Sequence, residues 1–83
     1  MTEIFEPIER ILREHCAVRE NIVLDSRLQE DLGLDSMGLL TLALETENYF
    51  DLCLDEPPDQ PPTNVREIVE LVALRLKERR EDP

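Results

Sequence analysis

Three stretches of this chain place apolar residues three and four positions apart, the spacing that gathers them on one face of a helix. The first stretch spans residues 3–16. Pro7 limits its start because a proline ring is tolerated only in the first helical turn, so we expect the helix to begin between residues 3 and 7. We expect His15, at its end, to face the helix dipole rather than to act as a catalytic base. The apolar positions are Ile4, Phe5, Ile8, Ile11 and Leu12.

Residues 36–50 predict a second helix whose first two turns are apolar nearly all round. Asp35 is suited to cap it, with Ser36 as the first helical residue. Only Gly38 and Thr41 interrupt the apolar band. A helix this apolar in so short a chain either packs at the centre of a bundle or presents its remaining apolar surface to a partner, and both interpretations stay open. The apolar residues are Met37, Leu39, Leu40, Leu42, Ala43 and Leu44.

A third helix is predicted near the end of the chain. Asn64 can cap it, and Glu67 stands three residues further on, as in a capping box. The charged residues 79–82 predict a frayed tail. The apolar stripe of this helix consists of Val65, Ile68, Val69, Val72 and Leu76.

The two connections between these helices differ in kind. Residues 17–34 have no sustained helical period, and their spaced leucines predict a long loop pinned to the core, a length that is often functional. Residues 51–62 contain four prolines, which exclude a regular helix, so we expect an extended or turn-rich connection with at most one helical turn. The leucines of the first connection are Leu24, Leu28, Leu32 and Leu34.

No stretch alternates with the two-residue period of a strand. The sequence therefore predicts an all-α fold, a small antiparallel bundle of three to four helices with a long first loop. The chain has 83 residues, which leaves room for one domain spanning residues 1–83.

The charge of the chain argues against several classes of partner. It carries 20 acids and nine bases, a formal charge of −11, which argues against nucleic-acid binding and against anionic membrane surfaces. No apolar run approaches the roughly 20 residues of a transmembrane helix, so we expect no membrane insertion. Nine of the acids and none of the Lys and Arg residues lie between residues 28 and 65. Such an unbalanced anionic face would steer basic partner surfaces and make binding strongly salt-dependent.

Few residues are suited to catalysis. One histidine, His15, and two distant cysteines, Cys16 and Cys53, argue against a zinc site and against a Ser-His-Asp triad. Read as reduced thiols, the cysteines fit a cytoplasmic setting. The Leu-Cys-Leu context predicts that Cys53 is buried and inert. We therefore expect a monomer without catalytic activity of its own, which acts through a partner or an attached group.

The best candidate for such an attachment is Ser36. Residues 31–37 read Asp-Leu-Gly-Leu-Asp-Ser-Met, which places this serine at the start of an apolar helix, behind a turn that contains Gly33. A helix N-terminus has unpaired N–H groups and a positive partial charge, so an anion attached there is stabilised. A phosphate diester on Ser36 suits this setting, although a simple capping serine explains the local pattern as well.

The sequence around Ser36 also follows a pattern that is known from a protein family. Asp35, Ser36 and Met37 match the hallmark Asp-Ser-Leu or Asp-Ser-Met at the start of the second helix in the acyl carrier protein family. Residues 28–33, Leu-Gln-Glu-Asp-Leu-Gly, resemble the stretch that precedes the family's serine. The resemblance covers the whole chain, from the first helix and long loop through the serine and second helix to the broken segment and last helix.

This resemblance implies a function and a set of partners. Ser36 would receive 4′-phosphopantetheine from coenzyme A, and the thiol of that arm would hold an acyl-type substrate as a thioester. A phosphopantetheinyl transferase would supply the base and Mg²⁺. An acyl- or aminoacyl-loading ligase or transferase, and a downstream synthase of a fatty-acid-like, polyketide-like or specialised pathway, would be the other partners. Asp35, Met37, Leu39 and Leu40 would contact the arm or the partners.

Two positions depart from the family. Many fatty-acid carriers have acids two and five residues after the serine, where this chain has Gly38 and Thr41. The departure favours a dedicated carrier of a specialised pathway. Residues 35–38, Asp-Ser-Met-Gly, are also similar to D-alanyl carrier proteins, so an aminoacyl cargo loaded by an ATP-dependent ligase stays open. An unmodified acidic module that only docks to a partner is the remaining alternative.

Overall fold

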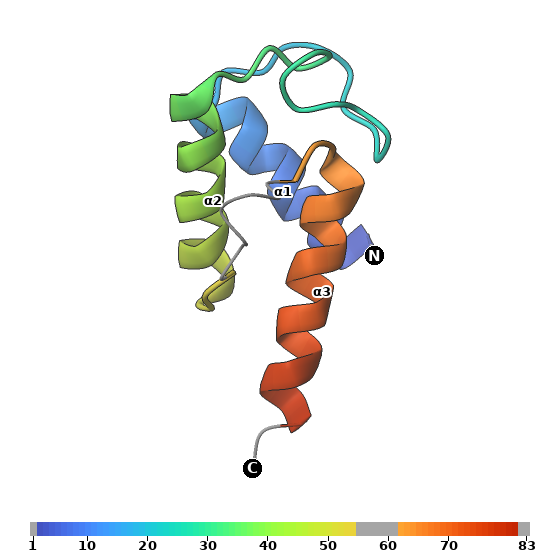
Figure 1. The fold of residues 1–83 in the computed structure, drawn as a ribbon, viewed down its shortest axis with the longest axis vertical. Coiled ribbons are helices and arrows are strands. Elements are labelled where there is room, and N and C mark those ends of the chain that lie inside the picture. The colour runs from blue at the N-terminus through green and yellow to red at the C-terminus, as the bar shows by residue number, and fades with distance from the viewer. Residues whose placement is uncertain (1, 55–61, 82–83) are drawn as a thin grey trace.

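The computed structural model describes residues 2–54 and 62–81, and it contains three helices: α1 (Thr2–His15), α2 (Ser36–Phe50) and α3 (Val65–Glu81). Figure 1 shows α1 running opposite to both α2 and α3, with the long first loop crossing over one end of the three helices. Helix α1 packs against both of the others. Within the described ranges there is no strand, only one isolated β-bridge between Arg27 and Asn64. The predicted all-α bundle with a long first loop is confirmed.

Helix α1 begins at Thr2, slightly before the expected range of residues 3 to 7, and Pro7 lies inside it. A proline at this position removes one backbone hydrogen bond close to the helix end. The first turn is nevertheless retained, because Ile4 and Phe5 pack against the core. Further along, Ile8 and Leu12 are fully buried, so the predicted apolar stripe is the one that faces the bundle.

The first loop is pinned to the core as predicted. Leu28, Leu32 and Leu34 are buried, and Leu24 packs against the core while partly exposed. The backbone of the loop is also tied to the residues that open α3. The Leu28 N–H donates to the Thr63 carbonyl at 2.9 Å. The loop is therefore a fixed part of the structure, held by packing and by hydrogen bonds.

The start of α3 carries the predicted cap. The N–H of Glu67 donates to Asn64 Oδ1 at 2.9 Å, and Glu67 Oε1 accepts the N–H of Thr63 at 3.0 Å. The reciprocal bond of this capping box thus reaches Thr63 rather than Asn64 itself. Hydrogen bonds from Thr63 lower the pKa of the Glu67 carboxyl. The predicted stripe is confirmed at its first four positions, which are buried: Val65, Ile68, Val69 and Val72.

The predicted frayed tail is wrong for the residues that the structure describes. Helix α3 continues to Glu81, and Arg79 Nη1 donates to the carbonyl oxygens of Phe50 and Asp51 at 3.0 and 2.8 Å. These carbonyls are at the end of α2, where a helix has acceptors without intrahelical donors. Arg79 therefore joins the end of α3 to the end of α2. Asp82, the last residue of the predicted tail, lies outside the described residues.

The connection between α2 and α3 is described only at its two ends. Asp51 adopts a left-handed conformation (φ 55°) and ends α2, and residues 52–54 are not helical. The prediction for residues 55–61 lies outside the described residues. Cys53 is exposed, so the expectation of a buried thiol is wrong. Its neighbour Leu54 is buried and Leu52 packs against the core, so these two side chains take the inward positions on either side of Cys53.

Candidate functional site

Ser36 is the first residue of α2, and its side chain is exposed at the end of the helix that the first loop approaches (Figure 1). Asp35 caps the helix in an extended conformation. Its Oδ1 accepts the N–H of Gly38 at 2.8 Å, and its backbone carbonyl accepts the N–H of Leu39 at 2.9 Å. The predicted cap and the predicted first residue of the helix are both confirmed. The serine hydroxyl is thus presented to solvent beside the positive end of the helix dipole.

The loop before Ser36 is held by a glycine turn and a buried leucine. Gly33 has a positive φ of 73°, a conformation that glycine adopts without strain. Leu34 is buried, and its N–H donates to the Leu28 carbonyl at 3.0 Å. A Cβ at Gly38 would lie 3.1 Å from Leu34 Cδ2, so the glycine lets the loop pack closely on the first turn of α2. The packed loop and the first turn of α2 therefore hold Ser36 in a fixed position.

The capping bond of Asp35 gives a direct prediction. Replacement of Asp35 by alanine is expected to destabilise the protein by about 1 kcal/mol, because the N–H of Gly38 loses its acceptor. Asparagine at the same position caps helices equally well and is expected to retain most of that stability. Urea unfolding of the two variants beside the wild type measures the difference. Equal destabilisation by both substitutions would mean that the charge of Asp35, and not its capping bond, matters.

The end of α1 also contacts the first turns of α2. Cys16 Sγ donates to the Gly38 carbonyl at 3.7 Å, and His15 Nδ1 lies 3.6 Å from Glu45 Oε2. Burial raises the pKa of the Cys16 thiol, and the nearby charge of Glu45 raises it further. Because the thiolate is the reactive form, this environment keeps Cys16 unreactive. His15 pairs with a carboxylate of another helix, an interaction that the prediction from the helix dipole did not include.

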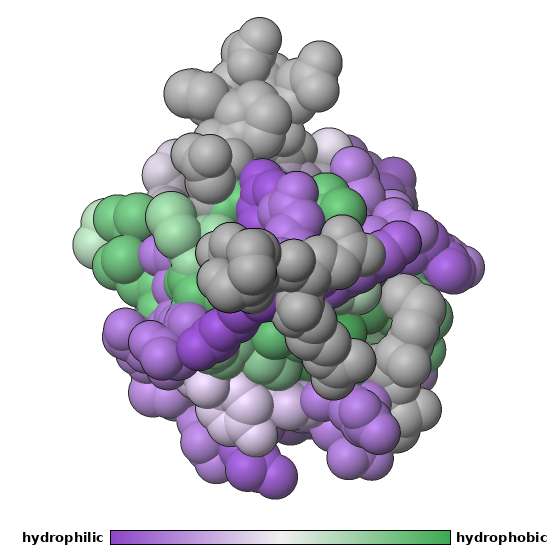
Figure 2. Space-filling view, turned by 90° about the horizontal axis from the view of Figure 1, so that it is seen from below, coloured by the Kyte–Doolittle hydropathy of each residue, from purple (hydrophilic) through white to green (hydrophobic). Residues whose placement is uncertain are grey.

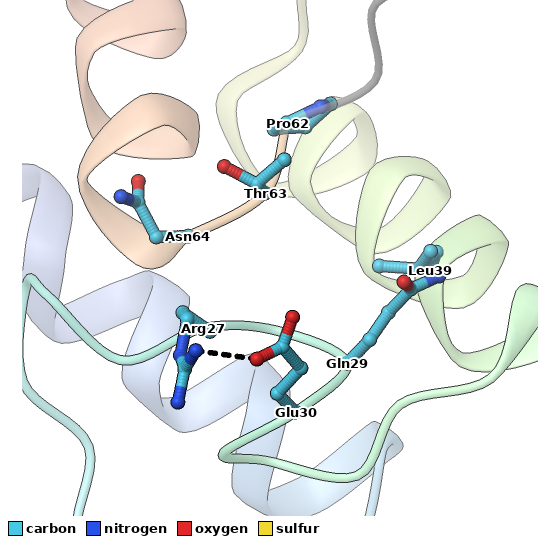
Figure 3. Close-up of a pocket in the computed structure, with 7 residues that line it drawn as sticks. All are labelled: Arg27, Gln29, Glu30, Leu39, Pro62, Thr63 and Asn64. Atoms are coloured by element: carbon cyan, nitrogen blue, oxygen red, sulfur yellow. Dashed lines mark ion pairs between the residues drawn. The ribbon is translucent and has the colours of Figure 1, made fainter.

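The four residues predicted beside Ser36 lie on different sides of α2. Met37 and Leu40 are exposed, with residue accessibilities of 68% and 53%, while Asp35 is used as the cap. Leu39 is half-buried and turns toward the loop and the start of α3 (Figure 3). Leu44 is 51% exposed and extends the outward row by one turn, although it was not among the predicted contacts. A row at positions 37, 40 and 44 follows the spacing of one helical face.

Leu39 lines a pocket of about 240 Å³. Figure 3 shows that the other lining side chains come from the first loop and from the residues that open α3. Arg27 and Glu30 form an ion pair at its edge, and Arg27 also pairs with Asp31 at 3.2 Å. Hydrogen bonds from Arg27 lower the pKa of the Asp31 carboxyl. Leu39, one turn from Ser36, and Pro62 are the apolar residues that line the pocket, and its polar lining residues also include Gln29, Thr63 and Asn64.

The part of the chain that the structure describes holds no group of three or more His, Cys, Asp or Glu side chains placed to bind a metal ion. None of its helices is long and apolar enough to cross a membrane. Taken together, the fold and the site are those of a small helical protein that presents one serine at the start of an apolar helix.

Comparison with known proteins gives the family. The chain is 34% identical over 70 residues to the acyl carrier protein of Phytoplasma mali (strain AT), and the match covers 83% of each chain. It is 32% identical over 80 residues to the acyl carrier protein of Amoebophilus asiaticus (strain 5a2), covering 95% of this chain and 100% of that protein. Identity to the acyl carrier protein of Aster yellows witches'-broom phytoplasma (strain AYWB) is 36% over 67 residues. No protein-family model matches the sequence. The chain belongs to the acyl carrier protein family.

Proposed function

We propose that this protein is a carrier that holds an acyl-type substrate as a thioester on a 4′-phosphopantetheine arm attached to Ser36. The observation that carries the proposal is the exposure of Ser36 as the first residue of α2. Membership of the acyl carrier protein family supports it. In this function the chain is a single carrier domain without catalytic activity of its own, and it delivers its cargo to partner enzymes.

The residues around Ser36 fit such an arm. The arm would be joined through a phosphodiester, whose negative charge is favoured at the N-terminus of a helix. Asp35 accepts the N–H of Gly38, so the N–H groups of the first two residues of α2 would remain available to an attached phosphate. When bound, the arm supplies a thiol for the thioester. Ser36 needs only to be accessible, because a phosphopantetheinyl transferase supplies the base, the Mg²⁺ and the coenzyme A.

We further propose that the carrier serves a specialised pathway, with a dedicated loading ligase or transferase and a downstream synthase. The uncharged positions Gly38 and Thr41 support this reading, since many fatty-acid carriers have acids there. The two free thiols keep a cytoplasmic setting as the expectation.

An aminoacyl cargo is the second candidate, and the pocket beside Leu39 favours it. The pocket is small, about 240 Å³, and five of its seven lining residues are polar or charged: Arg27, Gln29, Glu30, Thr63 and Asn64. A short cargo with an amino group would find hydrogen-bonding side chains there, whereas a long alkyl chain would find two apolar side chains, Leu39 and Pro62. In that case an ATP-dependent ligase would load the arm.

Intact-mass measurement tests the carrier function. The purified apo protein is incubated with coenzyme A, Mg²⁺ and a broad-specificity phosphopantetheinyl transferase, beside a carrier known to be modified. We expect a gain of one phosphopantetheine, and fragment masses that place it on the peptide containing Ser36. Folded protein that gains no mass while the control carrier is fully modified would leave an unmodified acidic module as the better account. Subsequent loading with acyl or aminoacyl groups distinguishes the two cargo classes.

A further inference from the structure

A second hollow lies away from Ser36, where the start of α1 meets the end of α2 and the second half of α3, and we call it the distal pocket. Its volume is about 440 Å³, within the range of roughly 300–1,000 Å³ that ligand pockets usually have. Figure 2 looks at the molecule from the end at which α3 finishes and shows hydrophobic surface between strongly hydrophilic residues. The lining residues are Glu3, Ile4, Phe50, Ala73, Leu76 and Lys77.

The apolar part of the lining comes from all three helices. Ile4 of α1, Phe50 of α2 and Leu76 of α3 are half-buried and pack against the core, so each has part of its surface left for the pocket. The fourth apolar residue, Ala73, carries only a methyl group, which leaves the hollow open beside it. A ligand with an apolar body would contact the three helices at once, and burial of its surface would favour binding.

Two opposite charges also line the distal pocket, Glu3 on α1 and Lys77 on α3, and both residues are exposed. They do not pair with each other, and within residues 2–54 and 62–81 neither side chain has an ion pair or a hydrogen bond. The neighbouring Arg75, by contrast, pairs with Glu78 at 2.9 Å. A carboxylate and an ammonium that line one hollow in this way are available to a ligand that carries both charges.

The charge of the whole chain narrows the class of ligand. An apolar anion, such as a fatty acid, would meet Lys77, but Glu3 and a net charge of −11 would oppose it. An apolar amine would pair with Glu3 but would bring a second cation beside Lys77. A molecule with both charges pairs with both side chains, and because it is neutral overall the net charge of the protein does not repel it. An apolar body that carries an ammonium and a carboxylate is a free amino acid with an apolar side chain.

We propose that the distal pocket binds a free apolar α-amino acid, with its ammonium at Glu3, its carboxylate at Lys77 and its side chain against the apolar lining. This inference goes beyond the carrier function and does not depend on it. Helix α2 has 15 residues and is about 22 Å long, so a ligand at its end leaves Ser36, at its start, accessible. A ligand that contacts three helices of the folded chain also stabilises the native state.

An NMR titration of the full, unmodified chain tests the proposal with three probes: L-leucine, 4-methylpentanoate and 3-methylbutylamine. The three share a branched alkyl group, but the second lacks the ammonium and the third lacks the carboxylate. We expect the backbone amide shifts of the lining residues to saturate with leucine at a Kd on the order of 1 mM. Both analogues are expected to bind at least about fivefold more weakly, since each loses one charged contact. Equal binding of the three probes, or no saturation with leucine about twentyfold above this Kd, would overturn the proposal.

Substitutions locate the site. Lys77→Gln and Glu3→Gln are each expected to weaken leucine binding by about fivefold. Arg10→Gln is the matched control, because Arg10 is an exposed cation of α1 that does not line the distal pocket. Ala73→Leu fills the hollow and is expected to abolish the saturable shifts, with circular dichroism to verify that the variant folds.

The outcomes of these variants are distinct. Weakening by Arg10→Gln as large as that by Lys77→Gln would show an effect of net charge and refute the site. Unchanged leucine binding in Lys77→Gln and Glu3→Gln would refute the two charged contacts. These two variants change exposed side chains, so they decide the question even where Ala73→Leu does not fold.

Discussion

Replacement of Ser36 by alanine is expected to abolish the addition of phosphopantetheine completely. The hydroxyl oxygen is the atom that would form the phosphodiester, and alanine has no group that can replace it. Because Ser36 is exposed and the capping bond from Gly38 goes to Asp35, the substitution leaves the structural contacts of the helix start intact. We expect the free energy of unfolding to change by no more than about 0.5 kcal/mol.

Two measurements on the same sample check this expectation. Intact mass after incubation with the transferase reports the modification, and urea unfolding reports the stability. Thr41 provides a matched hydroxyl control, since it is half-buried on the same helix, and Thr41→Ala is expected to keep the full mass gain. Modification that persists on the Ser36→Ala protein, or that is lost from the Thr41→Ala protein instead, would assign the arm to a different residue.

The features that the sequence predicted well are those set by neighbouring residues. Asp35 caps α2 and Asn64 caps α3 because a short polar side chain before an apolar helix reaches the first N–H groups whatever the rest of the chain does. The burial of leucines in the first loop was also predictable, since apolar side chains that are spaced through a polar stretch are most stable when they pack on the core. Local geometry thus accounts for the position and presentation of Ser36.

The features that the sequence missed depend on contacts between distant segments. Arg79 reaches the carbonyl of Asp51, 28 residues earlier, so a charged tail that resembles a frayed end is part of the structure. Cys53 is exposed because its neighbours take the inward positions. Which side of α2 turns inward, that of Leu39 and not that of Met37, likewise depends on where the loop and the residues just before α3 lie. None of these choices is encoded by the spacing of residues within one element.

Leu28→Ala is expected to remove a large part of the stability of the protein, even though the residue lies in a loop. Leu28 is only 1% exposed, and its backbone joins two parts of the chain: its N–H donates to Thr63 and its carbonyl accepts from Leu34. Loss of a buried leucine side chain typically destabilises by about 2–5 kcal/mol. Natural domains are stabilised by roughly 0.05–0.15 kcal/mol per residue, so for a chain of 83 residues this loss is a major fraction.

Urea unfolding followed by helicity measures the effect, and a second loop residue supplies the control. Val23 is 48% exposed in the same loop, and Val23→Ala is expected to change the stability by no more than about 0.5 kcal/mol. If Leu28→Ala is too unstable to give a folded baseline, Leu28→Met, which preserves the volume, is expected to fold with a loss below about 1.5 kcal/mol. Similar small effects for Leu28→Ala and Val23→Ala would mean that the loop is not packed as described. A much larger loss for Leu28→Ala than for Val23→Ala would support a loop that holds the start of α2, and with it Ser36, in place. Leu28 accepts a hydrogen bond from Leu34, and Leu34 packs against the first turn of α2.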